Sequence, residues 1–339
     1  MQFASTSRTI FCAILLVVLA SCSTEKPIGV SAKTGQVDRI TVLYDAFGKD
    51  VRMQKDWGYA ALVEVGGKRI LFDTGGDPKI FAQNVAAKNV DLRRLDFVVL
   101  SHRHADHMGG LTHLLKINPA VTIYAPKEAF GIYGSDLPSK FYRKHEALPA
   151  AMRYYGGAPP ETMTFGSAFP GAKIHLIDKT TEVTPGVTLI ALVSDTPGTK
   201  ELKELSLAID TPGGLIVVVG CAHPGIETVL AEAIKINPHI HMVAGGFHLV
   251  VAQDPMIDKV TAALDETLKV DLIAPGHCTG EPTFAALQKT FGERYLYAGV
   301  GSVIEITNKP DNVAQHQLIH RFDEADKSTY QSLMAENAD

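Results

Sequence analysis

The sequence contains no block of like charge. Its 339 residues include 32 Lys and Arg against 37 Asp and Glu, giving a formal net charge of −5. Proteins that bind a phosphate backbone concentrate positive charge on one face or tail, and this composition has no such footprint. We therefore expect no nucleic-acid partner. Hydrophobic residues make up 46% of the chain, which is ample for the core of a folded domain.

The N-terminal apolar run is too short to span a bilayer comfortably. It covers residues 10–19, follows Arg8 and ends in Leu19-Ala20-Ser21-Cys22, the layout of a cleaved export signal. The LASC tetrapeptide resembles a bacterial lipobox, which implies cleavage before Cys22 and a lipid thioether on its sulfur. An ordinary signal peptide with a chance cysteine is the alternative.

The lipobox resemblance predicts how the N-terminal part of the chain is organised. Residues 1–21 form the signal peptide, and residues 22–39 form the lipidated cysteine with a flexible polar tether. The protein is then exported and anchored to the cell envelope through Cys22. In a Gram-negative cell it faces the periplasm, on the inner or the outer membrane.

Cysteine is scarce, with four in the chain. Because Cys12 and Cys22 belong to the signal region, the folded domain keeps only Cys221 and Cys278. Two cysteines in an exported protein suggest a disulfide, but both lie beside histidines, in GCAHPG and PGHCTG. A disulfide, a soft metal ligand at Cys221 and two buried small apolar residues all remain open.

The chain is rich in histidine at one place, the segment SHRHADHMGG at residues 101–110. His102, His104, Asp106 and His107 are all metal-ligand types, and their nitrogen and oxygen donors suit zinc or a similar divalent ion. Packing three imidazoles and a carboxylate together without a cation costs desolvation and charge repulsion. The segment therefore predicts a metal site.

Apolar patterning places this segment at the end of a strand. LDFVVLSH is a continuous apolar run that ends at His102, which is typical of a buried strand. ALVEVGGKRILFDTGG predicts a hairpin about Gly66-Gly67 that leads to Asp73. MGGLTHLLKIN has the spacing of a helix.

The second half of the chain repeats this layout without a sequence repeat. ELSLAIDTPGGLIVVVGCAH predicts a hairpin whose second strand ends at Cys221 and His223. HIHMVAGGFHL and VDLIAPGHCTG predict buried strands that end at His248 and His277. Because α/β proteins build sites from loops at one sheet edge, these ends are expected to converge.

SHRHADH matches the H-x-H-x-D-H motif at every defined position, and the chain resembles the metallo-β-lactamase superfamily. The upstream FDTG and the late PGH also fit. The resemblance implies an α/β fold, an αββα sandwich over residues 40–306, with residues 307–339 as a polar tail. It implies that His102 and His104 bind a first metal, and that the second metal is bound by Asp106, His107 and His277. Asp73 supports the site.

Two stretches depart from the family pattern. Many members carry GHTPG, whose histidine binds the first metal, where this chain has Ser194-Asp195-Thr196-Pro197-Gly198. Many also carry GD, whose aspartate bridges the metals, where this chain has Gly220-Cys221. We expect His223 to complete the first ligand set, and we place Cys221 beside the metals without making it a ligand. One or two zinc ions per chain, or other divalent metals, remain open.

GCAHPGI, GGFHL and PGHCTG resemble a narrower subgroup, proteins like 7,8-dihydropterin-6-methyl-4-(β-D-ribofuranosyl)aminobenzene-5′-phosphate synthase. The superfamily at large is hydrolytic, and an exported lipoprotein is a poor place for pterin assembly. We therefore expect a metal-bound hydroxide to hydrolyse an ester, lactone or phosphoester of a small molecule. The synthase-like transferase is the alternative, and a non-catalytic surface metal-binding lipoprotein is a third hypothesis.

Two catalytic residues and a substrate region complete the prediction. Asp106 is expected to orient the nucleophile, and His248 to hydrogen bond substrate or donate a proton, with a purely structural histidine as its alternative. Residues 126–185 are too long for a simple connection and form a candidate lid insertion. Its Arg143, Lys144 and Tyr155 suit a planar anionic substrate, unless they lie on the solvated face of an amphipathic helix.

Overall fold

The computed structural model describes residues 1, 38–128, 135–138, 146–165, 169 and 171–306. The signal peptide, the lipidation site Cys22, most of the tether, the C-terminal tail, Arg143 and Lys144 lie outside these residues. Among the described helices, none has the length and apolar character needed to cross a membrane.

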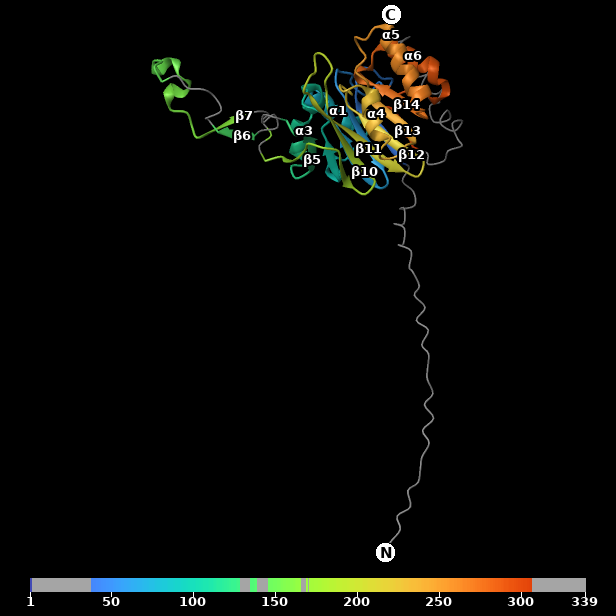
Figure 1. Cartoon of the computed structure of the whole chain (residues 1–339), viewed down its shortest axis with the longest axis horizontal. Coiled ribbons are helices and arrows are strands. Elements are labelled where there is room, and N and C mark those ends of the chain that lie inside the picture. The colour runs from blue at the N-terminus through green and yellow to red at the C-terminus, as the bar shows by residue number, and fades with distance from the viewer. Residues whose placement is uncertain (2–37, 129–134, 139–145, 166–168, 170, 307–339) are drawn as a thin grey trace, which may run out of the picture. The chain divides into compact units, whose positions relative to one another are not determined.

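Two mixed sheets make up the body of the domain (Figure 1). The first sheet consists, in spatial order, of β15 (Val303–Glu305), β1 (Arg39–Tyr44), β2 (Ala60–Val65), β3 (Lys68–Phe72), β4 (Phe97–Val99), β5 (Thr122–Pro126) and β8 (Lys173–Ile177). The second consists of β14 (Leu272–Gly276), β13 (Ile240–Gly246), β12 (Gly214–Val219), β11 (Lys203–Thr211), β10 (Val187–Val193) and β9 (Thr181–Thr184).

The sheets pack face to face around an apolar layer that includes Val42, Val63, Phe72, Leu207 and Val218. These strands are buried along almost their whole length, which explains their continuous apolar runs. Each such side chain contributes about 1.5–3 kcal/mol when fully buried. The inner layer therefore fixes the two sheets, and the loops at their edges, against each other.

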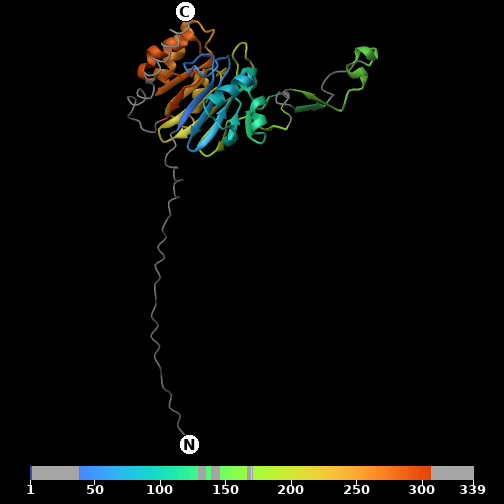
Figure 2. The ribbon, with the colours of Figure 1, turned by 180° about the vertical axis from the view of Figure 1, so that it is seen from behind.

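Helices cover the outer faces of both sheets, as the two opposite views show (Figures 1 and 2). Phe81 of α1 (Pro78–Ala87) and Leu114 of α3 (Leu111–Ile117) pack on the first sheet. Val229, Val260 and Leu287 pack on the second sheet from α4 (Ile226–Ala233), α5 (Asp254–Ala262) and α6 (Glu281–Phe291). The predicted αββα sandwich is confirmed.

Both predicted hairpins are present. β2 and β3 pair antiparallel up to Val65 and Lys68, and the intervening Gly66 and Gly67 have positive φ, as a tight two-residue hairpin turn requires. β11 and β12 pair antiparallel up to Thr211 and Gly214. Local turn chemistry therefore sets the register of these strands.

The candidate insertion at residues 126–185 is partly built into the sandwich. β8 pairs parallel with β5, and β9 pairs antiparallel with β10, so both strands extend the main sheets. In the part of the chain that joins β5 to β8, the strands β6 (Ser135–Pro138) and β7 (Thr162–Phe165) form a separate two-stranded sheet. The part that joins neither main sheet is therefore shorter than the sequence suggests, and its role as a lid stays a prediction.

Candidate metal centre

The loops that follow five strands converge at one place. β3 and β4 run parallel in the first sheet, and β12, β13 and β14 run parallel in the second. The carboxyl ends of parallel strands lie at the same edge, so each sheet delivers its loop residues to a common site. These residues are Asp73 after β3, Ser101 and His102 after β4, Cys221 and His223 after β12, His248 after β13 and His277 after β14.

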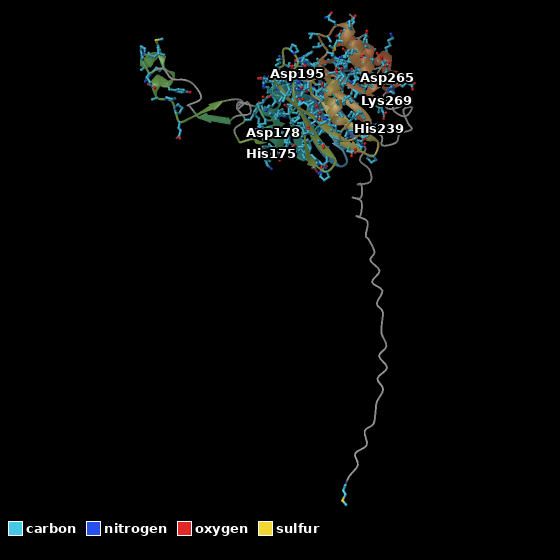
Figure 3. All side chains as sticks on the ribbon, in the orientation of Figure 1. His175, Asp178, Asp195, His239, Asp265 and Lys269 are labelled. Atoms are coloured by element: carbon cyan, nitrogen blue, oxygen red, sulfur yellow. The ribbon has the colours of Figure 1, made fainter. Side chains whose placement is uncertain are left out.

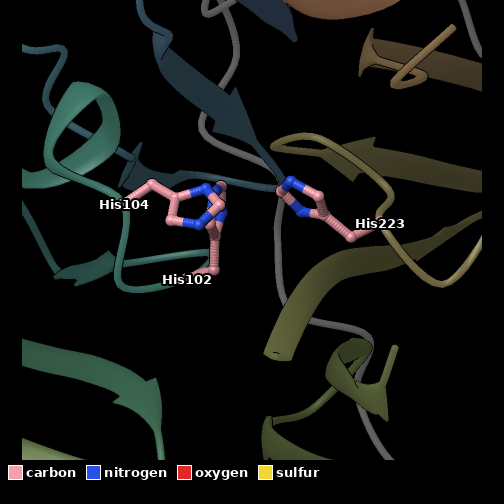
Figure 4. A group of neighbouring side chains, drawn as sticks. All are labelled: His102, His104 and His223. Carbon is pink, nitrogen blue, oxygen red and sulfur yellow. The ribbon is translucent and has the colours of Figure 1, made fainter. Parts of the chain in front are cut away.

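His102, His104 and His223 form one group of converging side chains (Figure 4). One ring nitrogen from each lies within 4.8 Å of the others, and His102 Nε2 is 3.0 Å from His104 Nδ1. His102 and His223 are buried, and His104 is partly exposed. The structure thus brings together the three residues predicted to bind the first metal.

Asp106, His107 and His277 form a second group. His107 Nε2 lies 3.2 Å from His277 Nε2, and Asp106 Oδ2 lies 3.7 and 3.6 Å from these two nitrogens. Ligands about 2.0 Å from a tetrahedral zinc ion are separated by about 3.3 Å. The three atoms are therefore spaced as the ligands of one divalent ion, and the donor set fits such an ion.

A buried carboxylate orients the ligands of the first sheet. Asp73 Oδ2 accepts hydrogen bonds from His107 Nδ1 and from Ser101 Oγ, both at 2.7 Å, and Ser101 Oγ lies 2.8 Å from His102 Nδ1. This arrangement leaves Nε2 of both histidines free to bind a cation, as carboxylate–histidine–metal pairs do. The structure places Asp73 where the predicted supporting role requires it.

The charges of Asp73 and His107 affect each other's pKa. Burial raises the pKa of the Asp73 carboxyl. Burial works against protonation of His107, but the Asp73 carboxylate outweighs it and raises the pKa of His107 to about 9. A cation that binds His107 must therefore displace a proton, so metal binding is favoured as the pH rises.

Glu204 orients a ligand histidine of the second sheet, as Asp73 does in the first. It was not among the residues predicted from the sequence. Its buried carboxylate on β11 accepts the Nδ1–H of His223 at 2.9 Å and the backbone N–H groups of Cys221, Ala222 and His223. Burial alone raises the pKa of Glu204, but the hydrogen bonds from His223 and the backbone bring it below its usual value. Glu204 thus holds His223 with Nε2 toward the ligand group.

A family model described as the metallo-beta-lactamase superfamily matches residues 58–277. The chain belongs to the metallo-β-lactamase superfamily. The family expected from SHRHADH is confirmed, and the metallo-β-lactamase fold usually binds metal.

Two curated relatives are proteins of Methanocaldococcus jannaschii. A 7,8-dihydropterin-6-methyl-4-(β-D-ribofuranosyl)-aminobenzene-5′-phosphate synthase is 31% identical over 299 residues, covering 80% of this chain and 98% of the relative. An uncharacterized protein is 27% identical over 264 residues, covering 74% of this chain and 93% of the relative.

A solved structure described as a metal-dependent hydrolase of the beta-lactamase superfamily is also similar. It aligns with a TM-score of 0.60 at 25% identity, and the match covers 80% of this chain and 99% of that structure.

The first departure from the superfamily pattern has a structural consequence. Asp195, where many members carry a ligand histidine, is exposed on the loop after β10 and belongs to no ligand group of the described residues (Figure 3). Its neighbours Ser194 and Thr196 donate hydrogen bonds from their hydroxyls to the carbonyl oxygen of His223, at 3.1 and 2.8 Å. The loop therefore supports the residue that takes the histidine's place.

The second departure puts Cys221 between the ligand groups. Cys221 and Cys278 are buried free thiols, so they form no disulfide in this structure. Cys221 Sγ lies 3.3 Å from His107 Nε2 and groups with His102 and His107, whereas Cys278 groups with Cys221 and His248.

Two further rings lie beside ligand histidines, and one of them, Trp57, was not among the residues predicted from the sequence. The ring of Trp57 lies 5.0 Å from that of His277, and 48% of its surface is exposed. His248 lies beside His223, with ring centroids 4.3 Å apart, and its buried Nδ1 makes no hydrogen bond within the described residues. Tyr155 is exposed and belongs to none of the ligand groups.

Gly109 and Gly110, which follow the histidines, let their backbone lie close to the backbone of the loop after β3. A Cβ added at Gly109 would lie 1.7 Å from the carbonyl oxygen of Gly76, and one at Gly110 would lie 2.1 Å from that of Thr74. The short helix α2 (Ala105–Met108), which carries Asp106 and His107, is thereby pressed against the loop after β3. This contact explains the composition of the segment.

We expect Gly109→Ala to displace α2 together with two ligands. Overpacking of this kind costs about 1–3 kcal/mol of unfolding free energy, and metal affinity should fall because Asp106 and His107 move. Urea denaturation and metal titration measure the two effects. A variant with wild-type stability and metal affinity would contradict this role of the glycine.

Proposed function

We propose that the protein is a metal-dependent hydrolase of an ester, lactone or phosphoester of a small molecule. This proposal rests mainly on two ligand groups at the edge where the parallel strands of both sheets end. One consists of three histidines, and the other of Asp106, His107 and His277. Superfamily membership and the similar hydrolase structure support an enzyme. Zinc fits the nitrogen-rich donor set best.

Divalent metals at such a centre activate water and polarise a carbonyl or phosphoryl oxygen. His102, His104 and His223 would hold one ion, and Asp106, His107 and His277 the other. Asp106 Oδ2 faces its ligand partners, and the side chain is 26% exposed. Its second oxygen can therefore accept a hydrogen bond from the attacking water and set its orientation.

Other partly exposed side chains serve the substrate. His248 is half-buried beside His223, and from there its imidazole can hydrogen bond the substrate or protonate a leaving group. Trp57 offers an exposed ring beside His277 on which a planar group can stack. These two residues join the predicted Arg143, Lys144 and Tyr155 as candidate substrate contacts.

His248→Ala tests the catalytic assignment. We expect turnover to fall by about 10²-fold or more while metal content is unchanged, because His248 stands outside both ligand groups that hold the ions. The matched control is His239→Ala, at an exposed histidine that pairs with Asp271 on the surface (Figure 3). Unchanged turnover in His248→Ala would show that this histidine is structural.

A synthase-like transferase is the second candidate, favoured by the 31% identity to the dihydropterin synthase over nearly its whole length. Two assays of the purified protein, each before and after chelation, would distinguish the candidates. The first measures hydrolysis of an ester, a lactone and a phosphodiester. The second measures condensation of a dihydropterin with 4-(β-D-ribofuranosyl)aminobenzene 5′-phosphate. Chelator-sensitive hydrolysis supports the hydrolase. Condensation without hydrolysis supports the transferase, and bound metal without either activity supports a metal-binding lipoprotein.

Export and lipid anchoring belong to the same proposal. They rest on the apolar run at residues 10–19 and on the tetrapeptide that ends at Cys22. Mass spectrometry of the protein from membranes tests them, and a mature chain that begins with diacylated Cys22 is the expected product.

A further inference from the structure

Asp45 is a fully buried carboxylate at the edge of the sheet where the ligand loops converge. It directly follows the last residue of β1. Because β1 pairs antiparallel with β2, and β2 pairs antiparallel with β3, β1 runs in the same direction as β3. Asp45 therefore lies at the same edge of the first sheet as Asp73, which follows β3.

The side chain of Asp45 binds the backbone of the ligand loop after β14. Its Oδ2 accepts a hydrogen bond from the backbone N–H of His277 at 2.8 Å, and its Oδ1 accepts one from the backbone N–H of Ala46 at 2.7 Å. Asp45 and His277 are 232 positions apart in the chain. The carboxylate thus connects the edge of the first sheet to a ligand loop of the second sheet.

Gly276 allows the carboxylate to lie this close to the loop. A Cβ added at Gly276 would lie 2.8 Å from Asp45 Oδ2, which is shorter than a side-chain carbon tolerates. Any larger residue at this position would push the carboxylate away from the N–H that it binds. The contact between Asp45 and the loop is therefore built into the residues on both sides of it.

His277 depends on its backbone for orientation more than the other ligand histidines do. His107 and His223 each have a carboxylate at Nδ1, whereas the buried Nδ1 of His277 makes no hydrogen bond with the described residues. The φ of His277 is +46°, in the left-handed region, which a residue with a Cβ adopts only where its surroundings hold it. The hydrogen bond from its N–H to Asp45 is one such restraint.

We propose that Asp45 is a positioning residue for the second metal ion. By holding the backbone of His277, it aims the Nε2 of this ligand at the ion that Asp106 and His107 would also bind. Asp45 itself contacts neither an ion nor substrate in this role, which rests on the proposed two-metal centre.

The effect should be confined to one ion. Asp73, through Ser101, and Glu204 orient His102 and His223 of the three-histidine group, so that group does not need Asp45. Removal of a group that orients a metal ligand lowers metal affinity about 10–100-fold. We therefore expect loss of Asp45 to weaken the binding of one ion by this factor and to leave the other ion unchanged.

A double-mutant cycle of Asp45→Ala and His277→Ala tests this role. Each metal-free protein is titrated with Zn²⁺ in competition with a chromophoric chelator, and bound zinc is counted by elemental analysis. We expect two ions in the wild type and a 10–100-fold weaker affinity for one of them in Asp45→Ala. Because Asp45 acts through His277, the double variant should bind zinc as His277→Ala alone does.

Asn84→Ala is the matched control. Asn84 is also a buried polar side chain, and its amide donates hydrogen bonds to the backbone carbonyl oxygens of Leu43 and Gln54 near the end of β1. This variant should unfold at a lower urea concentration but keep both zinc affinities. Asp45→Asn retains the shape and one acceptor oxygen, and it replaces Asp45→Ala if that variant does not fold. It should show a smaller loss of affinity for the same ion.

Two ions in the wild type with unchanged affinity for both in Asp45→Ala would overturn the positioning role and leave the two-metal centre standing. Losses that add in the double variant would also overturn it, because Asp45 would then act independently of His277. An equal loss of zinc affinity in Asn84→Ala would do the same, since general destabilisation would explain the effect. A wild type that binds no zinc would overturn both proposals.

Discussion

Glu204→Ala is expected to destabilise the metal-free protein by about 3–5 kcal/mol, because it leaves the backbone N–H groups of Cys221, Ala222 and His223 buried without an acceptor. It also frees the His223 ring from the hydrogen bond that orients it. Metal affinity should therefore fall about 10–100-fold. Urea denaturation of the metal-free protein and competitive metal titration measure the two effects.

The matched control for this substitution is Glu266→Ala, at an exposed glutamate in the π-helical segment Ala263–Thr267 that continues α5. Exposed substitutions of this kind change stability by about 0.5 kcal/mol or less. Equal effects of the two variants would contradict the role of Glu204. A stability loss in Glu204→Ala with unchanged metal affinity would limit that role to the fold of the loop.

Asp106→Ala is expected to remove one metal ion per chain and to lower turnover by about 10³-fold. Asp106 is the sole carboxylate in the ligand groups, and its partly exposed side chain lies 3.7 Å from His107 Nε2 and 3.6 Å from His277 Nε2. Elemental analysis and the turnover of a substrate that the wild type hydrolyses measure these effects.

We expect Asp106→Ala to change the stability of the metal-free protein far less than it changes metal content and turnover. The described residues make no hydrogen bond to the Asp106 carboxylate, and its contacts with His107 and His277 are long, at 3.7 and 3.6 Å, and partly exposed. The metal-free variant should therefore lose at most about 1 kcal/mol of unfolding free energy. Asp258→Ala, at an exposed position on α5, is the matched control and should retain both metals and full turnover. Asp106→Ala with full metal content and wild-type turnover would remove Asp106 from the site.

The fold could be predicted from local patterns in the chain. Gly66-Gly67 between two apolar runs predicted the first hairpin, and continuous apolar runs predicted the buried strands that carry His102 and His277. Since parallel strands end at one sheet edge, the convergence of their loops followed from the strand assignments. His223 was predicted from the missing histidine and lies in the three-histidine group.

Glu204 could not be predicted in the same way. In β11 it alternates with Leu205 and Leu207, and such alternation normally marks a solvent-facing side. Here the loop after β12 folds over that side and aims three backbone N–H groups at the carboxylate. The role of Glu204 depends on hydrogen bonds from a loop that is distant in the sequence, and the periodicity of a strand does not predict such contacts.

The extent of the insertion was hidden for a related reason. β8 and β9 are short and contain no buried side chain, so neither shows the continuous buried apolar run of a central strand. They become strands through pairing with β5 and β10 at the edges of the two sheets. Tertiary pairing of this kind overrides weak local preference.

Anomalous diffraction at the zinc absorption edge, from crystals of the zinc-loaded protein, tests the two-metal centre most directly. We predict two peaks, one bounded by His102, His104 and His223 and the other by Asp106, His107 and His277. Absence of both peaks, or a single peak bounded by Cys221, His248 and Cys278, would contradict the proposed centre.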